Sequence, residues 1–253
     1  MKILIISSNL IGDTVLSTGV IDHFVKNYPD AKFTFLVGPT AAQIYQHFPA
    51  LEKIIKIKKR SYNLHWFEMF LKNRKIKWDI VVDLRSSLLP YLLKAKKRFI
   101  FKKNNKLHHL DQLKNVFNLN NNFLNIYNSY REEEEVRENL NKNFKYIVIF
   151  PGGNWIPKIW PISNYNQLLI KLYKKYSHLK FIIVGSTIEE KKYFRNIKKN
   201  LPENLFVNLM GKSLTLTSAY MKKSNLFIGN DSGLMHLSVA SNLPTITLFG
   251  PTN

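Results

Sequence analysis

Residues 226–249 read LFIGNDSGLMHLSVASNLPTITLF, and this stretch holds three successive elements. The apolar run 226–229 predicts a strand, 234–241 predicts a helix, and 245–249 predicts a second strand. Two strands joined through a helix are typical of a parallel sheet, because parallel strands need a crossover connection. The stretch therefore indicates an α/β fold.

The same alternation extends back to residue 146. It predicts strands at 146–150, 181–184 and 205–208, and helices at 162–176, 189–200 and 217–224. Strands that alternate with helices indicate a doubly wound parallel sheet with helices on both faces.

The first half of the chain repeats this architecture. Lys2 to Ser8 predicts a strand, and the spacing of apolar residues after Asp13 predicts a helix that ends before Pro29. Further strands are predicted at 33–37, 54–57, 80–83 and 98–101. Residues 104–143 are rich in Asn and charge without a strand period, so we place a domain boundary at their end. The 253 residues then form two α/β domains, 1–143 and 144–253.

The chain is strongly basic, with 38 Lys and Arg against 17 Asp and Glu and a formal charge of +21. Such a charge attracts nucleic acid, an anionic membrane or an anionic substrate, and it does not choose among them. A compositional origin is the alternative, because the chain is crowded with the Lys, Asn and Ile that an AT-rich genome favours. Nucleic acid is the weakest of the three interpretations, because no binding motif accompanies the charge.

The apolar runs give no sign of export or of membrane insertion. The stretch Ile3 to Ile6 is too short for a signal peptide, and no run approaches the roughly 18 apolar residues of a membrane span. The absence of cysteine fits a reducing compartment. We expect a cytoplasmic protein whose charge is compatible with peripheral contact at the inner face of the cytoplasmic membrane.

Several nucleotide and metal motifs are missing from the sequence. No G-x-G-x-x-G follows a predicted strand, and Phe206 stands where a P-loop ending in Gly211-Lys212-Ser213 needs glycine. Neither an Asp-x-Asp pair nor H-E-x-x-H spacing supplies metal ligands. We therefore expect a metal-independent reaction and no bound cofactor.

The first strand-to-helix turn carries Gly12 and Asp13. Gly12 lets the backbone approach a ligand closely. Asp13 lies at the carboxyl end of the first predicted strand, where ligands of open α/β sheets bind, and a carboxylate there can act as a general base toward a hydroxyl. Asp is also a favoured N-cap residue, so capping of the following helix is the alternative.

The turn after residues 226–229 is Asn230-Asp231-Ser232-Gly233. It can present backbone N–H groups and a hydroxyl at a helix N-terminus, which favours an anion. Asp231 is itself an unfavourable neighbour for phosphate, and it can cap the helix or orient the amides. An ordinary capped helix is the alternative. His236 lies one turn into the helix, either toward a ligand or in a structural role.

A third turn, Pro151-Gly152-Gly153-Asn154, follows the strand at 146–150 and precedes Lys158. The two glycines allow close backbone approach, and the Lys158 ammonium can neutralise a diphosphate leaving group without metal. In a chain this rich in lysine, chance placement is the alternative.

These three turns resemble family 9 glycosyltransferases, the group that includes ADP-heptose:lipopolysaccharide heptosyltransferases. The resemblance rests on residues 11–18 (IGDTVLST) with 28–31 (YPDA), 151–161 (PGGNWIPKIWP), and 229–237 (GNDSGLMHL) continuing through 244–252 (PTITLFGPT). Gly19 stands where the family often has proline, and Ser232 replaces the more usual threonine while keeping the hydroxyl. Family members commonly continue beyond the position of Asn253.

The resemblance implies the GT-B fold, in which two Rossmann-like domains face a cleft, with the second domain expected in a truncated form. It implies inverting transfer of a heptose or related sugar from a nucleotide donor, expected to be the co-substrate ADP-heptose. Asp13 is then the catalytic base, and Lys158 stabilises the departing diphosphate. The donor-binding residues implied are Gly12, Gly152, Gly153, Asn154, Met210, Gly211, Asp231, Ser232, Gly233 and His236.

The expected acceptor is the lipopolysaccharide core or another acidic, lipid-linked surface glycan, bound by the first domain. Residues 58–78 interleave aromatic and basic side chains, as in a helix on an anionic membrane surface, and 94–103 add a second basic cluster. A solvated basic face over an ordinary aromatic core is the alternative. The competing function is that of a catalytically silent nucleotide-sugar-binding or glycan-binding protein of the same fold.

Overall fold

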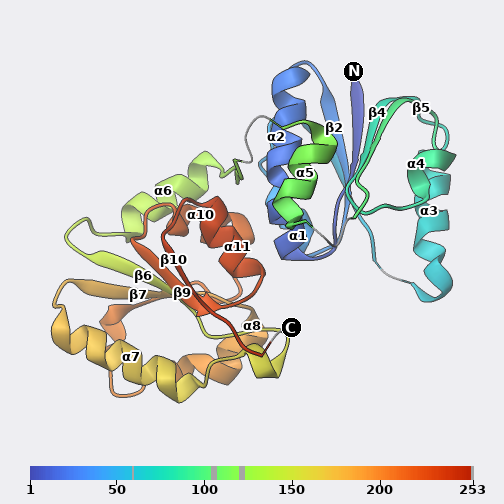
Figure 1. Cartoon of the computed structure of the whole chain (residues 1–253). Helices are drawn as coiled ribbons and strands as arrows, with labels where there is room; N and C mark the ends of the chain where they lie inside the picture. Colours follow the sequence, from blue (N-terminus) through green and yellow to red (C-terminus); the bar gives the residue numbers. More distant parts are fainter. Residues whose placement is uncertain (59, 104–106, 120–122, 252–253) are drawn as a thin grey trace. The chain divides into compact units, whose positions relative to one another are not determined.

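The computed structural model describes residues 1–58, 60–103, 107–119 and 123–251. By its internal contacts the chain divides into two units, Met1–Tyr127 and Asn128–Asn253, and each unit holds one five-stranded sheet (Figure 1). Both sheets are parallel throughout, and helices cover both faces of each. The predicted α/β class with two doubly wound sheets is confirmed.

The sheet of the first unit has the strand order β3-β2-β1-β4-β5. Its strands are β1 (Lys2–Ile6), β2 (Lys32–Val37), β3 (Leu51–Lys56), β4 (Trp78–Asp83) and β5 (Ala95–Ile100). Its helices are α1 (Ile11–Leu16), α2 (Thr18–Asn27), α3 (Leu64–Asn73), α4 (Leu89–Leu92) and α5 (His109–Phe117). In Figure 1, α1, α2 and α5 lie on one face of the sheet and α3 and α4 on the other. Strand order reverses between β1 and β4, so the loops after these two strands flank the position where doubly wound sheets bind ligands.

The sheet of the second unit has the order β10-β9-β6-β7-β8. Its strands are β6 (Lys145–Phe150), β7 (Leu179–Ile183), β8 (Phe206–Asn208), β9 (Leu226–Asn230) and β10 (Thr245–Leu248). Its helices are α6 (Tyr130–Asn139), α7 (Ile162–Lys175), α8 (Thr187–Glu189), α9 (Arg195–Ile197), α10 (Leu214–Met221) and α11 (Gly233–Ala240). Here the strand order reverses between β6 and β9.

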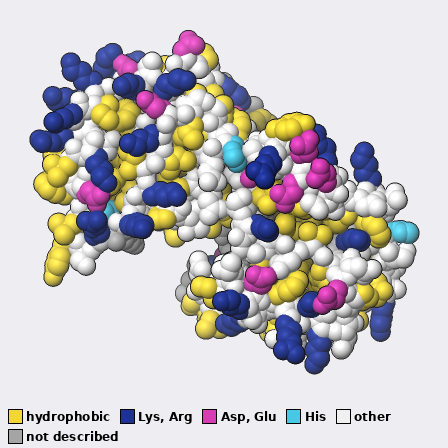
Figure 2. Space-filling view, turned by 180° about the vertical axis from the view of Figure 1, so that it is seen from behind, with side chains coloured by type: hydrophobic (Ala, Val, Ile, Leu, Met, Phe, Trp, Pro, Cys, Tyr) yellow, Lys and Arg dark blue, Asp and Glu magenta, His cyan; other side chains and the backbone are white. Residues whose placement is uncertain are grey.

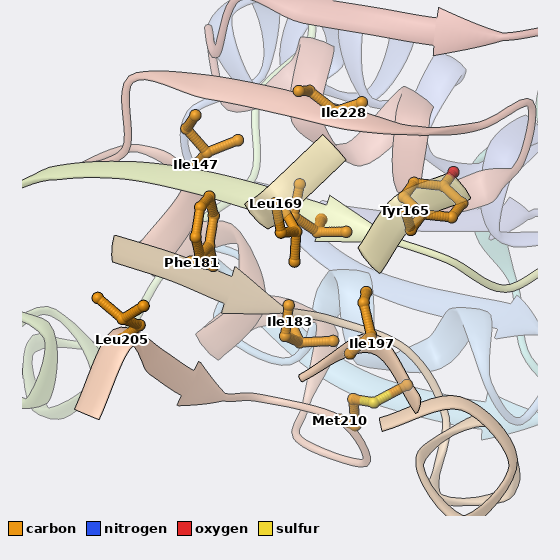
Figure 3. Packing of buried hydrophobic residues seen from close by; sticks show 10 residues of the cluster. Ile147, Tyr165, Leu169, Phe181, Ile183, Ile197, Leu205, Met210 and Ile228 are labelled. Atoms are coloured by element: carbon orange, nitrogen blue, oxygen red, sulfur yellow. The ribbon is translucent and has the colours of Figure 1, made fainter. Parts of the chain in front are cut away.

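The apolar core of the second unit is built where α7 packs on the sheet (Figure 3). Tyr165 and Leu169 of α7 are fully buried, and they lie four residues apart on one helix face that meets Phe181 and Ile183 of β7. Burial of each such side chain contributes about 1.5–3 kcal/mol relative to its exposure. The core therefore fixes the sheet on which the loops of the candidate site are mounted.

All ten predicted strands form, most of them within two residues of the predicted bounds. The helix predicted after Asp13 is divided at Ser17 into α1 and α2. The Ser17 hydroxyl donates to the carbonyl of Asp13 at 2.7 Å, and the Thr18 hydroxyl donates to that of Val15 at 2.7 Å. Side-chain hydroxyls that donate to helix carbonyls in this way compete with the backbone N–H groups of the regular helix.

The helix predicted at 189–200 begins earlier and ends sooner. Ser186 caps α8 through a reciprocal capping box with Glu189, a π-helical turn follows over Glu190–Phe194, and α9 ends at Ile197. The helix predicted at 217–224 is α10, which also begins earlier because Ser213 accepts a hydrogen bond from the Leu216 amide.

The region 104–143, which shows no strand period, contains α5 and α6. In α6 only Val136 is buried, so the apolar period is almost absent, and a capping box between Ser129 and Glu132 marks the helix start. The helix packs on α10, where Glu132 accepts a hydrogen bond from the Thr215 hydroxyl at 2.6 Å. Because α6 belongs with the second sheet, the units divide at Tyr127, not after residue 143.

Positive charge is prominent on one face of the molecule. Lys and Arg side chains predominate over Asp and Glu on the face shown in Figure 2, with hydrophobic side chains between them. In the part of the chain that the structure describes, no helix has the length and apolar character needed to cross a membrane.

Candidate functional site

The loops after β6 and β9 meet at the reversal point of the second sheet. The buried side chain of Asn230, the last residue of β9, holds them together. Its Nδ2 donates to the Gly152 carbonyl at 2.8 Å, and its Oδ1 accepts from the Trp160 amide at 3.1 Å and from the Tyr165 hydroxyl at 2.9 Å. Burial raises the pKa of Tyr165, so this hydroxyl stays protonated and able to donate.

Lys158 and Asp231 form an ion pair across this reversal point. Lys158 ends a short 3-10 turn, Ile156–Lys158, and its Nζ lies 2.5 Å from Oδ2 of Asp231. Gly250, two residues after the end of β10, lies against this turn, and a Cβ at its position would lie only 2.7 Å from the Cα of Lys158. The structure thus brings together two residues that the sequence places in separate candidate turns.

Ser232 is the N-cap residue of α11, and neither it nor Asp231 provides a side-chain cap. The Ser232 Oγ is buried and has no hydrogen-bond partner among the described residues. An ordinary capped helix is therefore not what forms here. The uncapped N-terminus begins at Gly233 with free amides that favour an anion. His236 lies one turn further, half-buried, and its amide donates to the Ser232 carbonyl at 3.4 Å.

Gly152 and Gly153 pack against Glu189, which is not among the residues predicted from the sequence. The Gly153 amide donates to Glu189 Oε1 at 2.9 Å, and a Cβ on Gly152 would lie 1.8 Å from the same oxygen. The other oxygen of Glu189 accepts from the amide and hydroxyl of Ser186. A glutamate three residues after a serine is the capping-box signal that could have located this carboxylate.

The remaining candidates of the second unit lie at the edge of this arrangement. Asn154 is exposed in the loop after β6. Gly211 has φ of +79°, a backbone conformation that favours glycine, and its amide donates to the Gly185 carbonyl at 2.7 Å. The Met210 side chain is 5% exposed in the apolar core, so at this position a ligand can reach the backbone more readily than the side chain.

In the first unit, Asp13 lies within α1 and does not cap it. The N-cap residue is Leu10, which makes no side-chain cap, and Gly12 and Asp13 follow in the first turn of the helix. The exposed carboxylate of Asp13 accepts a hydrogen bond from the Ser8 hydroxyl at 3.1 Å. The capping alternative was wrong, and Asp13 lies in the helix that follows β1, near the carboxyl end of that strand.

Two further side chains stand in the electrostatic field of Asp13. Burial lowers the pKa of Arg85 and of His109, and the negative charge of Asp13 opposes both shifts. Arg85 follows β4 and His109 begins α5, so both belong to the same edge of the sheet. Among the residues that the structure describes, no three His, Asp or Glu side chains gather in a way that could hold a metal ion.

Two doubly wound parallel sheets with polar loops at their reversal points are the architecture of GT-B glycosyltransferases, and solved heptosyltransferases share the fold. The chain belongs to glycosyltransferase family 9 (heptosyltransferase), whose family model matches residues 98–253. It is therefore a glycosyltransferase.

Relatives and solved structures extend the similarity over the whole chain. Lipooligosaccharide heptosyltransferase 2 of Campylobacter jejuni is 26% identical over 266 residues, which cover 100% of this chain and 82% of the relative. Lipopolysaccharide heptosyltransferase 1 of Campylobacter coli is 26% identical over 293 residues, with 100% and 84% covered.

Among solved structures, a family 9 glycosyl transferase from Veillonella parvula aligns with a TM-score of 0.81 and 21% identity, covering 100% of this chain and 81% of that one. Escherichia coli heptosyltransferase WaaC, solved with ADP-2-deoxy-2-fluoro heptose, aligns with a TM-score of 0.77 and 17% identity, covering 100% and 90%.

Proposed function

We propose that this glycosyltransferase moves a heptose from ADP-heptose to an acceptor of the lipopolysaccharide core. The relatives named above are lipopolysaccharide and lipooligosaccharide heptosyltransferases, and WaaC was solved with ADP and with a fluorinated ADP-heptose. The observation that carries the proposal in this chain is the Lys158–Asp231 pair beside the uncapped N-terminus of α11. A cation and free amides at one point suit a diphosphate.

In the proposed reaction, Asp13 accepts the proton of an acceptor hydroxyl. The hydroxyl oxygen attacks the anomeric carbon of the heptose from the side opposite the diphosphate, and the bond from that carbon to the diphosphate oxygen breaks. The configuration is inverted, and ADP leaves with both bonding electrons. Lys158, the amides of Ser232 and Gly233, and the Ser232 hydroxyl stabilise the charge that develops on ADP, so the chain itself supplies the cation that a metal provides elsewhere.

The test is transfer by the purified chain from ADP-heptose to heptose-deficient lipopolysaccharide. We expect transfer with inverted anomeric configuration, retained in EDTA, and lost by about 100-fold or more in Asp13→Asn because general-base catalysis contributes about 10²–10⁴-fold. Asp30→Asn is the matched control, since Asp30 is an exposed carboxylate of the same unit. Tight ADP-heptose binding without transfer to any acceptor would support the silent binder instead.

We also propose that the first unit meets the acceptor at the inner face of an anionic membrane. On α3, Leu64, Phe67 and Leu71 are 55%, 60% and 45% exposed, and their spacing puts them near one face of the helix. Lys72, whose side chain is 53% exposed and forms an ion pair with Glu68 at 2.6 Å, borders this face. The helix is shorter than the basic segment predicted from 58–78, of which Lys59 lies outside the described residues.

Sedimentation with vesicles tests this membrane contact. We expect binding to vesicles that contain phosphatidylglycerol, weakened by salt and by Phe67→Ser, because an apolar helix face and lysines act together at a membrane surface. Ile188→Ser, which removes an exposed apolar side chain of the second unit, is the control. Equal binding to neutral and anionic vesicles would refute the proposal.

A further inference from the structure

Arg85 occupies the same kind of position in the first sheet that Lys158 and Asp231 occupy in the second. The last residues of β1 and β4, Ile6 and Asp83, are paired in register. Ser8 and Arg85 therefore lie equally far past the ends of the two strands between which the strand order reverses. Ser8 binds Asp13, so the proposed base and the Arg85 side chain flank one ligand-binding position.

The backbone around Arg85 is held tightly. The buried carboxylate of Asp83 accepts from the Arg85 amide at 2.8 Å and from the amide and hydroxyl of Ser87 at 2.6 and 2.9 Å. The Ser86 hydroxyl donates to the Phe101 carbonyl. With Asp83 engaged by the backbone, the conformation of the loop after β4 does not depend on the Arg85 side chain.

The Arg85 side chain is oriented but not neutralised. Its guanidinium lies over the ring of Trp66, 5.2 Å from the centroid, and Nη1 donates to Asn9 Oδ1 at 3.2 Å. Among the described residues, no carboxylate lies within ion-pair distance of it. One of its several N–H donors is therefore engaged, and the others are available in a planar fork that matches carboxylate and phosphate.

His109 has a buried ring nitrogen without a hydrogen-bond partner among the described residues, at the same edge of the sheet as Arg85. Its ring packs against Phe101, the residue that follows β5, with centroids 5.3 Å apart. Its Nε2 is buried and has no hydrogen-bond partner in the described part of the chain. A buried polar atom without a partner is costly and uncommon, so a ligand that reaches this edge has a hydrogen bond to gain.

We propose that Arg85 binds an anionic group of the acceptor, a carboxylate or a phosphate, and so places the neighbouring hydroxyl at Asp13. The assignment rests on the proposed transferase function and deepens it. Asn9 and Trp66 fix the guanidinium plane, and the ligand completes its charge pairing. Arg85 is a specificity-determining residue that acts on acceptor binding, whereas the donor is bound by residues of the second unit.

The test is equilibrium binding of the delipidated oligosaccharide of heptose-deficient lipopolysaccharide, measured by calorimetry without donor. We expect Arg85→Met to weaken binding by about tenfold to a hundredfold, the range for loss of a charge-assisted hydrogen-bonding pair. Arg85→Lys keeps the charge without the fork and should fall between Arg85→Met and the wild type. Arg74→Met is the matched control, because Arg74 is an exposed arginine of the same unit, and it should bind as the wild type does.

Chemically altered oligosaccharides identify the anion. One sample is dephosphorylated, and in another the carboxyl groups are reduced. The treatment that removes the group bound by Arg85 should weaken binding to the wild type and should not change binding to Arg85→Met. Equal binding of the intact oligosaccharide by Arg85→Met and the wild type would overturn the proposal. It would also be overturned if Arg85→Met weakened binding of an oligosaccharide that lacks both anions as much as it weakens binding of the intact one.

Turnover separates this proposal from the proposed function. Arg85→Met should raise the KM for the acceptor and leave the KM for ADP-heptose unchanged. Arg85-dependent binding without any transfer would refute the transferase function alone, and transfer that does not depend on Arg85 would refute the anion site alone. If the wild type neither binds the oligosaccharide nor transfers to it, both are refuted.

Discussion

Lys158 Nζ lies 2.5 Å from Asp231 Oδ2, so the cation proposed for the leaving group is already paired within the chain. Side-chain exposure is 25% for Lys158 and 23% for Asp231, which leaves both accessible to a ligand. A diphosphate that binds here must compete with Asp231 for the ammonium. The two residues should therefore affect nucleotide binding in opposite directions.

Lys158→Met should weaken ADP binding and lower kcat by about 10²–10³-fold, the range for loss of one group that stabilises developing charge. Asp231→Asn should tighten ADP binding, because the competing carboxylate charge is removed. Calorimetric titration with ADP measures both effects, and Lys171→Met on the exposed face of α7 is the control. A tightening of ADP binding in Lys158→Met would contradict the assignment.

The same pair should contribute little to stability. A partly exposed ion pair contributes about 0–1 kcal/mol, so neither Lys158→Met nor Asp231→Asn should change the free energy of unfolding by more than that. Urea denaturation measures it. A loss of several kcal/mol would show that the pair has a structural role, and the kinetic effects would then need another explanation.

Asn230 should behave differently, because it is buried and connects three segments. Asn230→Ala leaves the Gly152 carbonyl and the Trp160 amide without their partner, and we expect a loss of about 2–4 kcal/mol, since a buried unsatisfied group costs about 1–3 kcal/mol. Tyr165→Phe removes one hydroxyl and should cost about 1 kcal/mol. Denaturation curves that rank the two variants in the reverse order would refute this account of Asn230.

The sequence predicts the central strands of both sheets well and the edge strands less well, because the apolar pattern of a strand depends on its burial. Buried parallel strands are continuous apolar runs, as in β6, where five of six residues are buried. At the sheet edge the signal weakens. β5 begins with exposed lysines, so only its second half was predicted. In α6 a single residue, Val136, is buried, and no apolar period could reveal the helix.

Residues of the candidate site also differ in how far the sequence predicts them, according to whether their role depends on a local motif or on a distant contact. Turns rich in glycine are visible locally, so Gly152, Gly153 and Ser232 could be proposed from the sequence. Arg85 could not, because its role depends on a contact with Asn9, 76 positions away. Glu189 carries a capping-box signal with Ser186, but its contact with Gly153, 36 positions away, is not visible in the sequence. Pattern and spacing within a segment do not report which distant loops a sheet brings together.

The fit of Gly152 against Glu189 gives a paired prediction. A Cβ at Gly152 would lie 1.8 Å from Glu189 Oε1, so Gly152→Ala must displace that carboxylate and break its bond to the Gly153 amide. We expect Gly152→Ala to lower the melting temperature and weaken ADP binding. In the double variant Gly152→Ala/Glu189→Ala the clash is gone. Its loss of melting temperature and of ADP binding should therefore be smaller than the sum of the losses in the two single variants. Strict additivity of the two losses would argue against the contact.

Tyr127, the last residue of the first unit, is fastened to α2 by a hydrogen bond from its hydroxyl to Asp22 Oδ1 at 2.5 Å. Burial, together with the hydrogen bond to Asp22 and the negative charge of Asp22, raises the pKa of Tyr127 to about 12, and burial is the largest of these causes. Ionisation of the phenol would break the bond and place two negative charges together.

The pH dependence follows from the direction of this shift. Because the pKa of Tyr127 is higher in the folded chain than its ordinary 10.0, the bond stabilises the fold fully below pH 10, and the contribution is lost as pH rises toward 12. The difference in unfolding free energy between the wild type and Tyr127→Phe should therefore shrink over this interval. Asp22→Asn removes the charge and should lower the Tyr127 pKa, measured by carbon-13 NMR of labelled tyrosine with Tyr127→Phe to assign the signal. An unchanged pKa in Asp22→Asn would mean that burial alone produces the shift.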